Sequence, residues 1–426
     1  MFFKKKEKKI VVLGIDGVPY SFLKTGLDEG KFPNIRKITK ENGRLKKYNS
    51  VYPTVSSVAW TSYMTGKNPA EHSIFGFVDR NTNPFSLKIP LASDRTAKTL
   101  WEKLSLEGKK VLVMNVPVTY PPEEVNGILI SGFLTPGIEK VVQPSSYVGY
   151  LKEKGYVIDV DPRFGHTDRR KFMDELHKAL DIRMEVFFDL LSKDNYFLAQ
   201  CHIMETDRIN HFFWGDYEDR GEFGDDFDKF YTKLDEWIGK TYELLNDQDI
   251  FIVLSDHGFC KVKYNVQINQ FLEDEGYLLW EASDPKNVTE LSPDSKAYSL
   301  IPGRIFINLE GREAKGTISG SDYDKLREEL KEKLLGLGSP EGEKIIEKAF
   351  YREEIYSGDY IKNAADIIVH PKWGFDLKGN VNTGEICQKP GAIDGMHTYE
   401  DAVIFGRGIN LTEVNSIQDP LKILLT

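Results

Sequence analysis

Short, uninterrupted apolar runs recur along the chain and predict buried strands. The runs occupy residues 10–15, 111–116, 128–131, 196–203, 250–255 and 402–406. They are continuous rather than alternating, which is typical of strands covered on both faces of a sheet. Amphipathic helical spacing appears between them, at 97–104 and 227–238. This alternation predicts an α/β fold, an α/β/α sandwich around a mainly parallel sheet, with ligands beyond the carboxyl ends of the strands.

The stretch 261–389 has a different pattern. It combines a polar, breaker-rich segment at 281–296, a strand-like run at 304–309 and a charged helical pattern at 323–335. Strand signals typical of the core return at 366–370 and again at 402. Because 426 residues exceed the usual size of a single core, we predict an inserted, smaller cap at 261–389. The core would then comprise residues 1–260 and 390–426.

Composition and charge narrow the possible functions. The chain is 40% hydrophobic and 29% charged, as globular proteins are. Its net charge of −10 argues against a protein that coats nucleic acid. Three cysteines, with no close pair, predict no disulfide framework and a cytoplasmic location. No stretch approaches the ~20 apolar residues of a membrane helix. The basic residues at 1–9 are interpreted as a tail and not as a signal peptide, because no small-residue cleavage site follows.

Acidic residues and histidines directly follow two of the apolar runs. Asp16 ends the first run, and Asp256 and His257 follow the run at 250–255. A carboxylate in such a position is costly unless it is paired or ligates a cation. The sequence alone leaves an alternative open at both places, because Asp16 could cap a turn and Asp-His-Gly could be a plain turn.

A further pair of candidate ligands lies on a predicted helix. Asp207 and His211 are four residues apart, which places both side chains on one helical face and suits binding of one metal ion. An exposed helix pair is the alternative, but the position just after the run at 196–203 favours ligation. His397 lies in a predicted glycine-bounded turn before the last strand, and its assignment depends on the other ligands.

Candidate nucleophiles gather before Gly66. The hydroxyl residues are Thr54, Ser56, Ser57, Thr61, Ser62 and Thr65. A serine beside a divalent metal can ionise because the cation stabilises the alkoxide. Spacing does not choose among these hydroxyls, and Ser56 or Ser57 could instead cap a helix that runs to Thr65. The two roles are compatible, since free N–H groups at a helix start also favour phosphate.

The order of these motifs resembles the alkaline phosphatase superfamily, and most closely its type I phosphodiesterase/nucleotide pyrophosphatase branch. The order is Asp16, a hydroxyl upstream of Thr65-Gly66, Asp207-x-x-x-His211, Asp256-His257-Gly and Gly-Met-His397. The resemblance extends from about residue 9 to 408. A prokaryotic group of predicted phosphohydrolases or phosphomutases has similar sequence segments, which in this chain read SDHGF, PGRIFINLEGRE, GMH and AVIFG.

The resemblance implies a site with two divalent ions, zinc with manganese as the alternative. One ion would be held by Asp16, Asp256, His257 and the nucleophile, and the other by Asp207, His211 and His397. Counting back from Thr65-Gly66 places the nucleophile on Ser56, with Ser57 adjacent. The implied function is hydrolysis of a small-molecule phosphate mono- or diester through a phosphoserine intermediate.

Two departures from the family pattern loosen this assignment. Ser56 stands where the branch usually has Thr, and Ala59 stands where nucleotide pyrophosphatases carry an Asn that binds a phosphoryl oxygen. The sulfatase signature is absent. A phosphomutase-like transfer and a non-enzymatic binding protein with a relic fold remain alternatives. The histidines without a ligand pattern are His72, His166, His177, His202 and His370.

Overall fold

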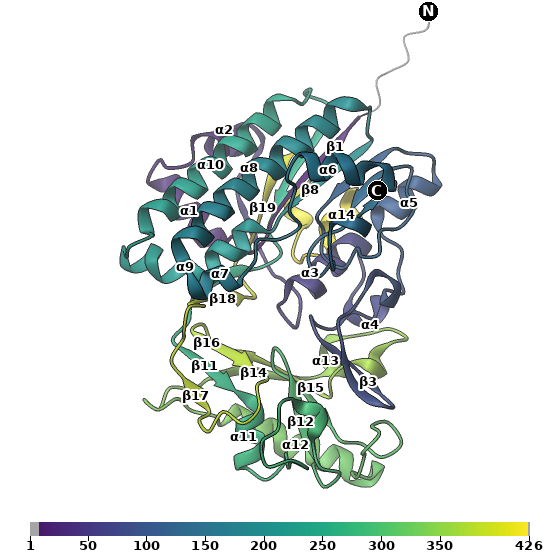
Figure 1. Cartoon of the computed structure of the whole chain (residues 1–426), viewed down its shortest axis with the longest axis vertical. Helices are drawn as coiled ribbons and strands as arrows, with labels where there is room; N and C mark the ends of the chain where they lie inside the picture. The colour runs from purple at the N-terminus through teal and green to yellow at the C-terminus, as the bar shows by residue number, and fades with distance from the viewer. Residues whose placement is uncertain (1–7, 425–426) are drawn as a thin grey trace, which may run out of the picture.

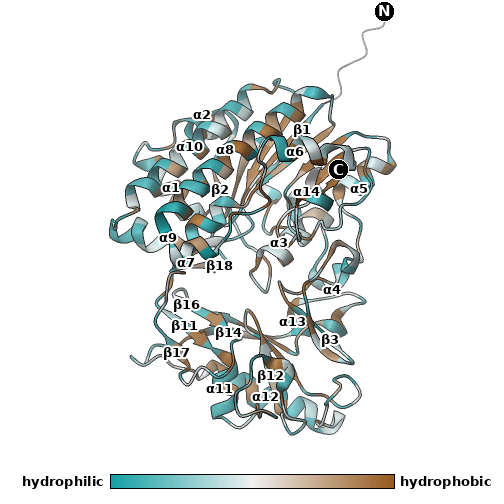
Figure 2. Cartoon of the chain, in the orientation of Figure 1, coloured by the Kyte–Doolittle hydropathy of each residue, from teal (hydrophilic) through white to brown (hydrophobic). Residues whose placement is uncertain are grey.

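The computed structural model describes residues 8–424 and has two lobes (Figure 1). The larger lobe consists of helices around a central sheet, and the smaller lobe contains short strands and a few helices. Hydrophobic residues line the strands inside both lobes, whereas the outward faces of the helices are hydrophilic (Figure 2). The predicted basic tail at 1–9 lies largely outside the described residues.

An eight-stranded sheet forms the centre of the larger lobe, in the order β2-β19-β9-β1-β8-β5-β6-β7. Its strands are β1 (Ile10–Ile15), β2 (Lys46–Tyr48), β5 (Val111–Met114), β6 (Gly127–Ile130), β7 (Val142–Gln143), β8 (Leu198–Ile203), β9 (Ile250–Leu254) and β19 (Ala402–Arg407). All six predicted strands belong to this sheet. The five strands from β9 to β6 are parallel, and β2, β19 and β7 pair antiparallel. The sheet is therefore mainly parallel, as predicted.

Helices cover both faces of this sheet. One face is covered by α1 (Tyr20–Asp28), α2 (Pro33–Asn42), α8 (Arg169–Lys193), α9 (Glu205–Asp219) and α10 (Gly224–Glu243). The other face is covered by α3 (Ser56–Thr65) and α5 (Leu100–Leu106), and α14 (Asp419–Leu424) lies beside α3. The side chains of β1 alternate between the two hydrophobic cores: Val11 and Leu13 join the first core and Val12 the second. Burial on both faces explains why the strands read as continuous apolar runs. The predicted α/β/α sandwich is confirmed.

The smaller lobe contains a four-stranded sheet in the order β12-β13-β15-β14 and a three-stranded sheet in the order β16-β11-β17. Its elements are β11 (Tyr264–Gln267), β12 (Ala297–Leu300), β13 (Arg304–Ile307), β14 (Ile346–Tyr351), β15 (Ile367–Pro371), β16 (Phe375–Lys378), β17 (Cys387–Gln388), α11 (Ile268–Asp274), α12 (Gly320–Leu335) and α13 (Arg352–Ile355). The lobe has its own hydrophobic core, to which α12 contributes buried leucines. The strand signal at 366–370, which resembled a core strand, is β15 and pairs within this lobe.

A hairpin from the N-terminal half of the chain packs on the smaller lobe. It consists of β3 (Asp79–Thr82) and β4 (Phe85–Lys88). The guanidinium of Arg80 pairs with the carboxylate of Glu313 at 2.9 Å, and both side chains are buried. Ala314 N–H also donates to the carbonyl of Thr82. The hydrophobic pattern of the strands did not indicate this long-range packing.

A buried ion pair fixes the start of α9 against α8. Nε of Arg183 lies 3.0 Å from both carboxylate oxygens of Glu205, and both side chains are 1% exposed. The guanidinium also donates to the carbonyls of Val157 and Ile158. Glu205 lies in the first turn of α9, two residues before Asp207. The ion pair therefore sets the position of the helix that carries two of the candidate ligands.

Replacing Arg183 should destabilise the fold strongly. In Arg183→Met the Glu205 carboxylate stays buried without its partner, which costs about 3–5 kcal/mol of unfolding free energy. Lys178→Met, at an exposed position on the same helix, should change it by less than about 0.5 kcal/mol. Urea unfolding followed by circular dichroism measures both. Equal midpoints for the two variants would contradict the role of this pair.

Candidate metal centre

The carboxyl ends of neighbouring strands bring distant acidic residues together. β1 and β9 are adjacent and parallel, so Asp16, which follows β1, lies beside Asp256 and His257, which follow β9. The turn after Asp16 requires glycine, because Gly17 has a φ of +67° and a Cβ there would lie 2.4 Å from the Phe259 ring. Gly17 N–H donates to Oδ1 of Asp256 at 3.1 Å, which ties the two strand ends together.

The first group of side chains consists of Asp16, Ser56, Asp256 and His257. Oγ of Ser56 lies 3.1 Å from Oδ1 of Asp16 and 3.3 Å from Nε2 of His257. Nε2 of His257 lies 3.3 Å from Oδ2 of Asp256. All four side chains are buried. This is the set that the family resemblance implied for one of the two ions.

The second group consists of Asp207, His211 and His397. Oδ1 of Asp207 lies 3.3 Å from Nε2 of His397 and 3.4 Å from Nε2 of His211. The two Nε2 atoms are 3.0 Å apart. Asp207 and His211 are both on α9, as the i, i+4 spacing predicted. The structure therefore brings together all seven side chains that the sequence singled out.

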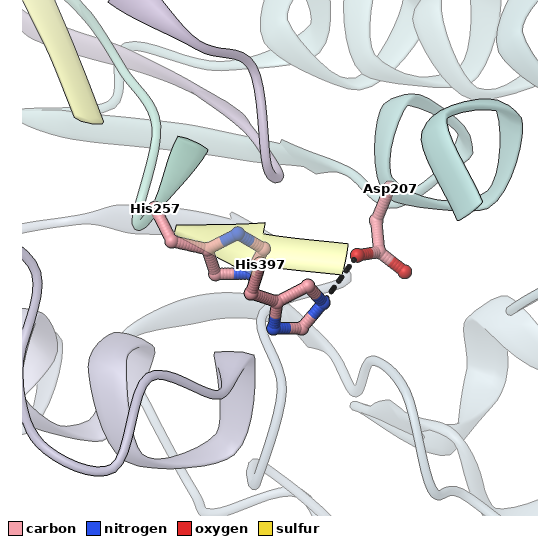
Figure 3. Close-up of side chains that lie close together, drawn as sticks. All are labelled: Asp207, His257 and His397. Atoms are coloured by element: carbon pink, nitrogen blue, oxygen red, sulfur yellow. Dashed lines mark ion pairs between the residues drawn. The ribbon is translucent and has the colours of Figure 1, made fainter. Parts of the chain in front are cut away.

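The two groups adjoin each other. One ligand atom each from Asp207, His257 and His397 lies within 4.8 Å of the others. The rings of His257 and His397 stack with their centroids 3.7 Å apart, and Figure 3 shows Asp207 facing His397. Two cations bound in these groups would therefore be close neighbours, as in two-metal sites.

His397 does not lie in a turn, as the sequence suggested. It belongs to β18 (Gly395–Thr398), which pairs antiparallel with β10 (Gly258–Lys261) directly after His257. In this register His397 lies opposite Phe259. The prediction of a turn was wrong because the four-residue strand is held by a remote partner and has no hydrophobic pattern of its own.

The three imidazoles are oriented as metal ligands are. Nδ1 of His211 is 2.9 Å from the carbonyl of Gly395, and Nδ1 of His397 is 3.0 Å from that of Thr54. Nδ1 of His257 is 3.1 Å from its neighbour's carbonyl. Since a carbonyl only accepts, each Nδ1–H donates, which leaves Nε2 of each ring facing the site. The Nε2 atoms of His211 and His397 are 3.0 Å apart, so both can ligate one cation.

Unpaired carboxylate oxygens point to the same conclusion. Oδ1 of Asp207 and Oδ2 of Asp256 are buried and have no hydrogen-bond partner. Burial, with the nearby Asp16 charge, raises the pKa of Asp256 well above its usual value. A bound cation would remove that penalty by stabilising the ionised carboxylate. The residues present therefore fit divalent metal ions.

Burial keeps two of the imidazoles neutral. It lowers the pKa of His257 to about 3 and that of His211 to about 4. For His397, burial acts in the same direction, but the carboxylate of Asp207 outweighs it and raises the pKa. Neutral His257 and His211 are ready to donate to a metal at neutral pH without first losing a proton.

Two residues that the sequence did not assign to the site hold Asp16. Nε2 of His202 lies 2.7 Å from Oδ2 of Asp16, and the indole N–H of Trp60 donates to the same oxygen at 2.9 Å. Although burial opposes it, the His202 contact keeps the pKa of Asp16 below its usual value. With Oδ2 occupied in this way, Oδ1 faces Ser56. No local sequence pattern marked His202, because its contact with Asp16 depends on the pairing of β1 with β8, in which His202 lies opposite Gly14.

The structure distinguishes the two adjacent serines. The N-cap of α3 is Val55, so neither Ser56 nor Ser57 caps the helix, and that alternative is wrong. Oγ of Ser57 is buried without a hydrogen-bond partner and belongs to neither group. Only Ser56, of the two, has its hydroxyl among the candidate ligands.

A cavity of about 160 Å³ opens beside the second group, between the two lobes. Its lining includes His211 and His397 from the metal groups, Tyr52 and Phe77 from the larger lobe, and Trp373 and Lys378 from the smaller lobe. Near this cavity, Arg208 pairs with Asp159 through its Nε at 3.0 Å. Lys67 similarly pairs with Glu71 at 2.8 Å.

Comparison with known families agrees with this geometry. The type I phosphodiesterase/nucleotide pyrophosphatase family matches residues 10–400. The chain belongs to this family. It is accordingly a hydrolase that acts on phosphate ester bonds, and not a non-enzymatic binding protein. Members of the family depend on divalent metals. No curated protein matches the sequence.

Solved structures with the same fold cover nearly the whole chain. Phosphonoacetate hydrolase from Sinorhizobium meliloti 1021, in complex with phosphonoformate, has a TM-score of 0.65 at 14% identity, covering 98% of this chain and 94% of that one. Murine ectonucleotide pyrophosphatase/phosphodiesterase 5, an inactive variant in complex with AMP, has a TM-score of 0.56 at 15% identity, with the same coverage. Among residues 8–424, no helix has the length and apolar character needed to cross a membrane.

Removing the His202 contact should weaken metal binding. His202→Leu frees Oδ2 of Asp16 from one of its two donors, so the carboxylate loses its fixed orientation, and affinity should fall about 10–100-fold. His202→Gln, whose side-chain amide can still donate a hydrogen bond to Asp16, should lose less metal affinity. His166→Leu, at an exposed position, should leave the metal affinity unchanged. Competition with a fluorescent zinc chelator measures these affinities. Unchanged affinity in His202→Leu would contradict the role.

Proposed function

We propose that this phosphoester hydrolase uses Ser56 as its nucleophile and forms a phosphoserine intermediate at a site for two divalent ions. The observation that carries the proposal is the position of the Ser56 hydroxyl, 3.1 Å from Asp16 and 3.3 Å from His257. Among the six candidate hydroxyls before Gly66, it is the one that contacts the candidate ligands. The substrate is a small-molecule phosphate ester.

The metal ligands divide as the two groups do. Asp16, Asp256 and His257, with Ser56, would hold one ion, and Asp207, His211 and His397 the other. Three carboxylates and three imidazoles favour zinc, with manganese as the alternative. When bound, the two cations would stabilise the Ser56 alkoxide and the charge that develops on the phosphoryl oxygens.

The chain's own residues perform the remaining steps. Asp16 and His257 hold the Ser56 oxygen at the start of α3, where it attacks phosphorus and the bond to the leaving oxygen breaks. The leaving alkoxide takes a proton from water and departs as the alcohol. A water molecule then attacks phosphorus, the bond to the Ser56 oxygen breaks, phosphate is released and the oxygen regains its proton. Ala59 offers no amide to the phosphoryl group. The first turn of α3, whose earliest internal bond runs from Val58 to Val55, can supply N–H donors in its place.

The cavity between the lobes supports a place for the rest of the substrate. It adjoins His211 and His397 and is lined by aromatic side chains from both lobes, Tyr52 and Trp373 among them. The organic part of the ester would lie there. We further propose that residues 261–389 act as a specificity cap, since its Trp373 and Lys378 belong to the cavity wall.

Ser56→Ala should reduce turnover of an aryl phosphate ester at least about 1,000-fold, because the nucleophile is lost. Ser57→Ala is the matched control and should retain turnover within a few-fold. The metal content of both proteins should equal that of the wild type, which excludes loss of the site itself. Full turnover by Ser56→Ala, or loss of turnover in Ser57→Ala alone, would contradict the assignment.

Removal of the metals should abolish hydrolysis, and zinc or manganese should restore it. The measurement is release of alcohol and phosphate from a panel of mono- and diesters before chelation, after chelation and after each ion is added back. A sugar phosphate or phosphoglycerate in the same panel separates hydrolysis from phosphomutase-like transfer, because a mutase returns an isomer instead of phosphate. Full activity in excess chelator would contradict the metal-dependent mechanism.

A further inference from the structure

A second set of candidate ligands lies away from the metal centre, where the smaller lobe meets the larger one. It consists of Glu347 on β14, His370 on β15 and Glu400, which follows β18 in the larger lobe. We call these three residues the inter-lobe cluster. One ligand atom from each lies within 4.8 Å of the others. His370 was among the histidines without a ligand pattern in the sequence.

A β-bulge directs Glu347 toward His370. In the antiparallel pair of β14 and β15, Ile346 lies opposite Pro371 and Lys348 opposite His370, so Glu347 is an extra residue without a partner. A bulge of this kind turns its side chain away from the regular alternation, and bulges are frequent beside functional sites. The bulge places a carboxylate on the same side of the sheet as the imidazole.

His370 has an unsatisfied nitrogen in a buried position. The residue is 6% exposed, and its Nε2 atom has no hydrogen-bond partner. This atom lies 3.4 Å from Oε1 of Glu400. Two ligand atoms that are each about 2.1 Å from a tetrahedral zinc ion lie roughly 3.4 Å apart. The spacing of His370 and Glu400 therefore already matches joint coordination of one ion.

Within residues 8–424, neither Glu347 nor Glu400 forms an ion pair with a lysine or arginine. The side chain that faces Glu400 is His370, whose contact lowers the pKa of the Glu400 carboxyl well below its usual value. A divalent cation bound among the three side chains would stabilise both ionised carboxylates. The imidazole is also held in place, since the ring of Tyr52 contacts it edge-on at 5.3 Å and stacks on Tyr399 at 4.0 Å.

We propose that the inter-lobe cluster binds a third divalent cation, through Nε2 of His370 and one carboxylate oxygen each from Glu347 and Glu400. One imidazole and two carboxylates suit zinc or manganese. The ion joins two strands of the smaller lobe to the loop that follows His397. Because His370 also lines the cavity beside the metal centre, this ion fixes one wall of that cavity.

Counting bound ions tests the proposal. The full chain is saturated with zinc, passed through a desalting column and analysed for zinc per chain by mass spectrometry. His370→Gln and Glu347→Gln should each hold one ion fewer than the wild type. Glu332→Gln, at an exposed position on α12, is the matched control and should hold the wild-type number. Glu347→Gln alters an exposed side chain and so keeps the test independent of any folding defect in His370→Gln.

The difference of one ion does not depend on how many ions the metal centre holds, so it is separate from the proposed function. Asp207→Asn is the complementary variant. It should lose ions from the metal centre but keep the ion at the inter-lobe cluster. If His370→Gln and Glu347→Gln retain the wild-type zinc content, the proposal is overturned, and the cluster is then a protonated imidazole between two carboxylates.

Discussion

The concentration of negative charge at one edge of the central sheet constrains the rest of the structure. Asp16, Asp207 and Asp256 are buried, and the charge of Asp16 adds to burial in raising the pKa of Asp256. The pKa of Asp16 itself stays below its usual value because His202 contacts its carboxylate. Such an arrangement is costly without a compensating positive charge. Burial keeps His211 and His257 neutral, so among the three imidazoles only His397, whose pKa Asp207 raises, can offset part of this charge. Divalent cations bound there would offset the rest, which explains the geometry of the site.

The parallel sheet produces this arrangement through connectivity. β9, β1 and β8 are consecutive in the sheet, so the segments that follow them meet at one edge although they are far apart in the sequence. α9 begins two residues after β8 and carries its ligand pair to the same edge. The ion pair of Arg183 and Glu205 and the hydrogen bonds to Asp16 then restrict the side chains that the strands have brought together.

Much of the fold and the membership of the candidate site could be predicted from the sequence, because both depend on local patterns. Continuous apolar runs identify strands that are buried on both faces, and acidic residues at their ends identify the edge where ligands bind. The errors have a common cause in long-range pairing. The strand of His397 forms only because it pairs with β10, and the hairpin at 79–88 is held by Glu313. His202 contacts Asp16 because β8 lies next to β1 in the sheet. The choice between Ser56 and Ser57 depended on the rotation of α3, which spacing alone does not define.

X-ray diffraction at the zinc absorption edge, from crystals of the zinc-loaded protein, would locate the bound ions directly. We expect two adjacent anomalous peaks, one among Asp16, Ser56, Asp256 and His257 and the other among Asp207, His211 and His397. The Ser56 oxygen should lie within coordination distance of the first. A fully loaded crystal without anomalous density at these side chains, or with both ions out of reach of Ser56, would contradict this expectation.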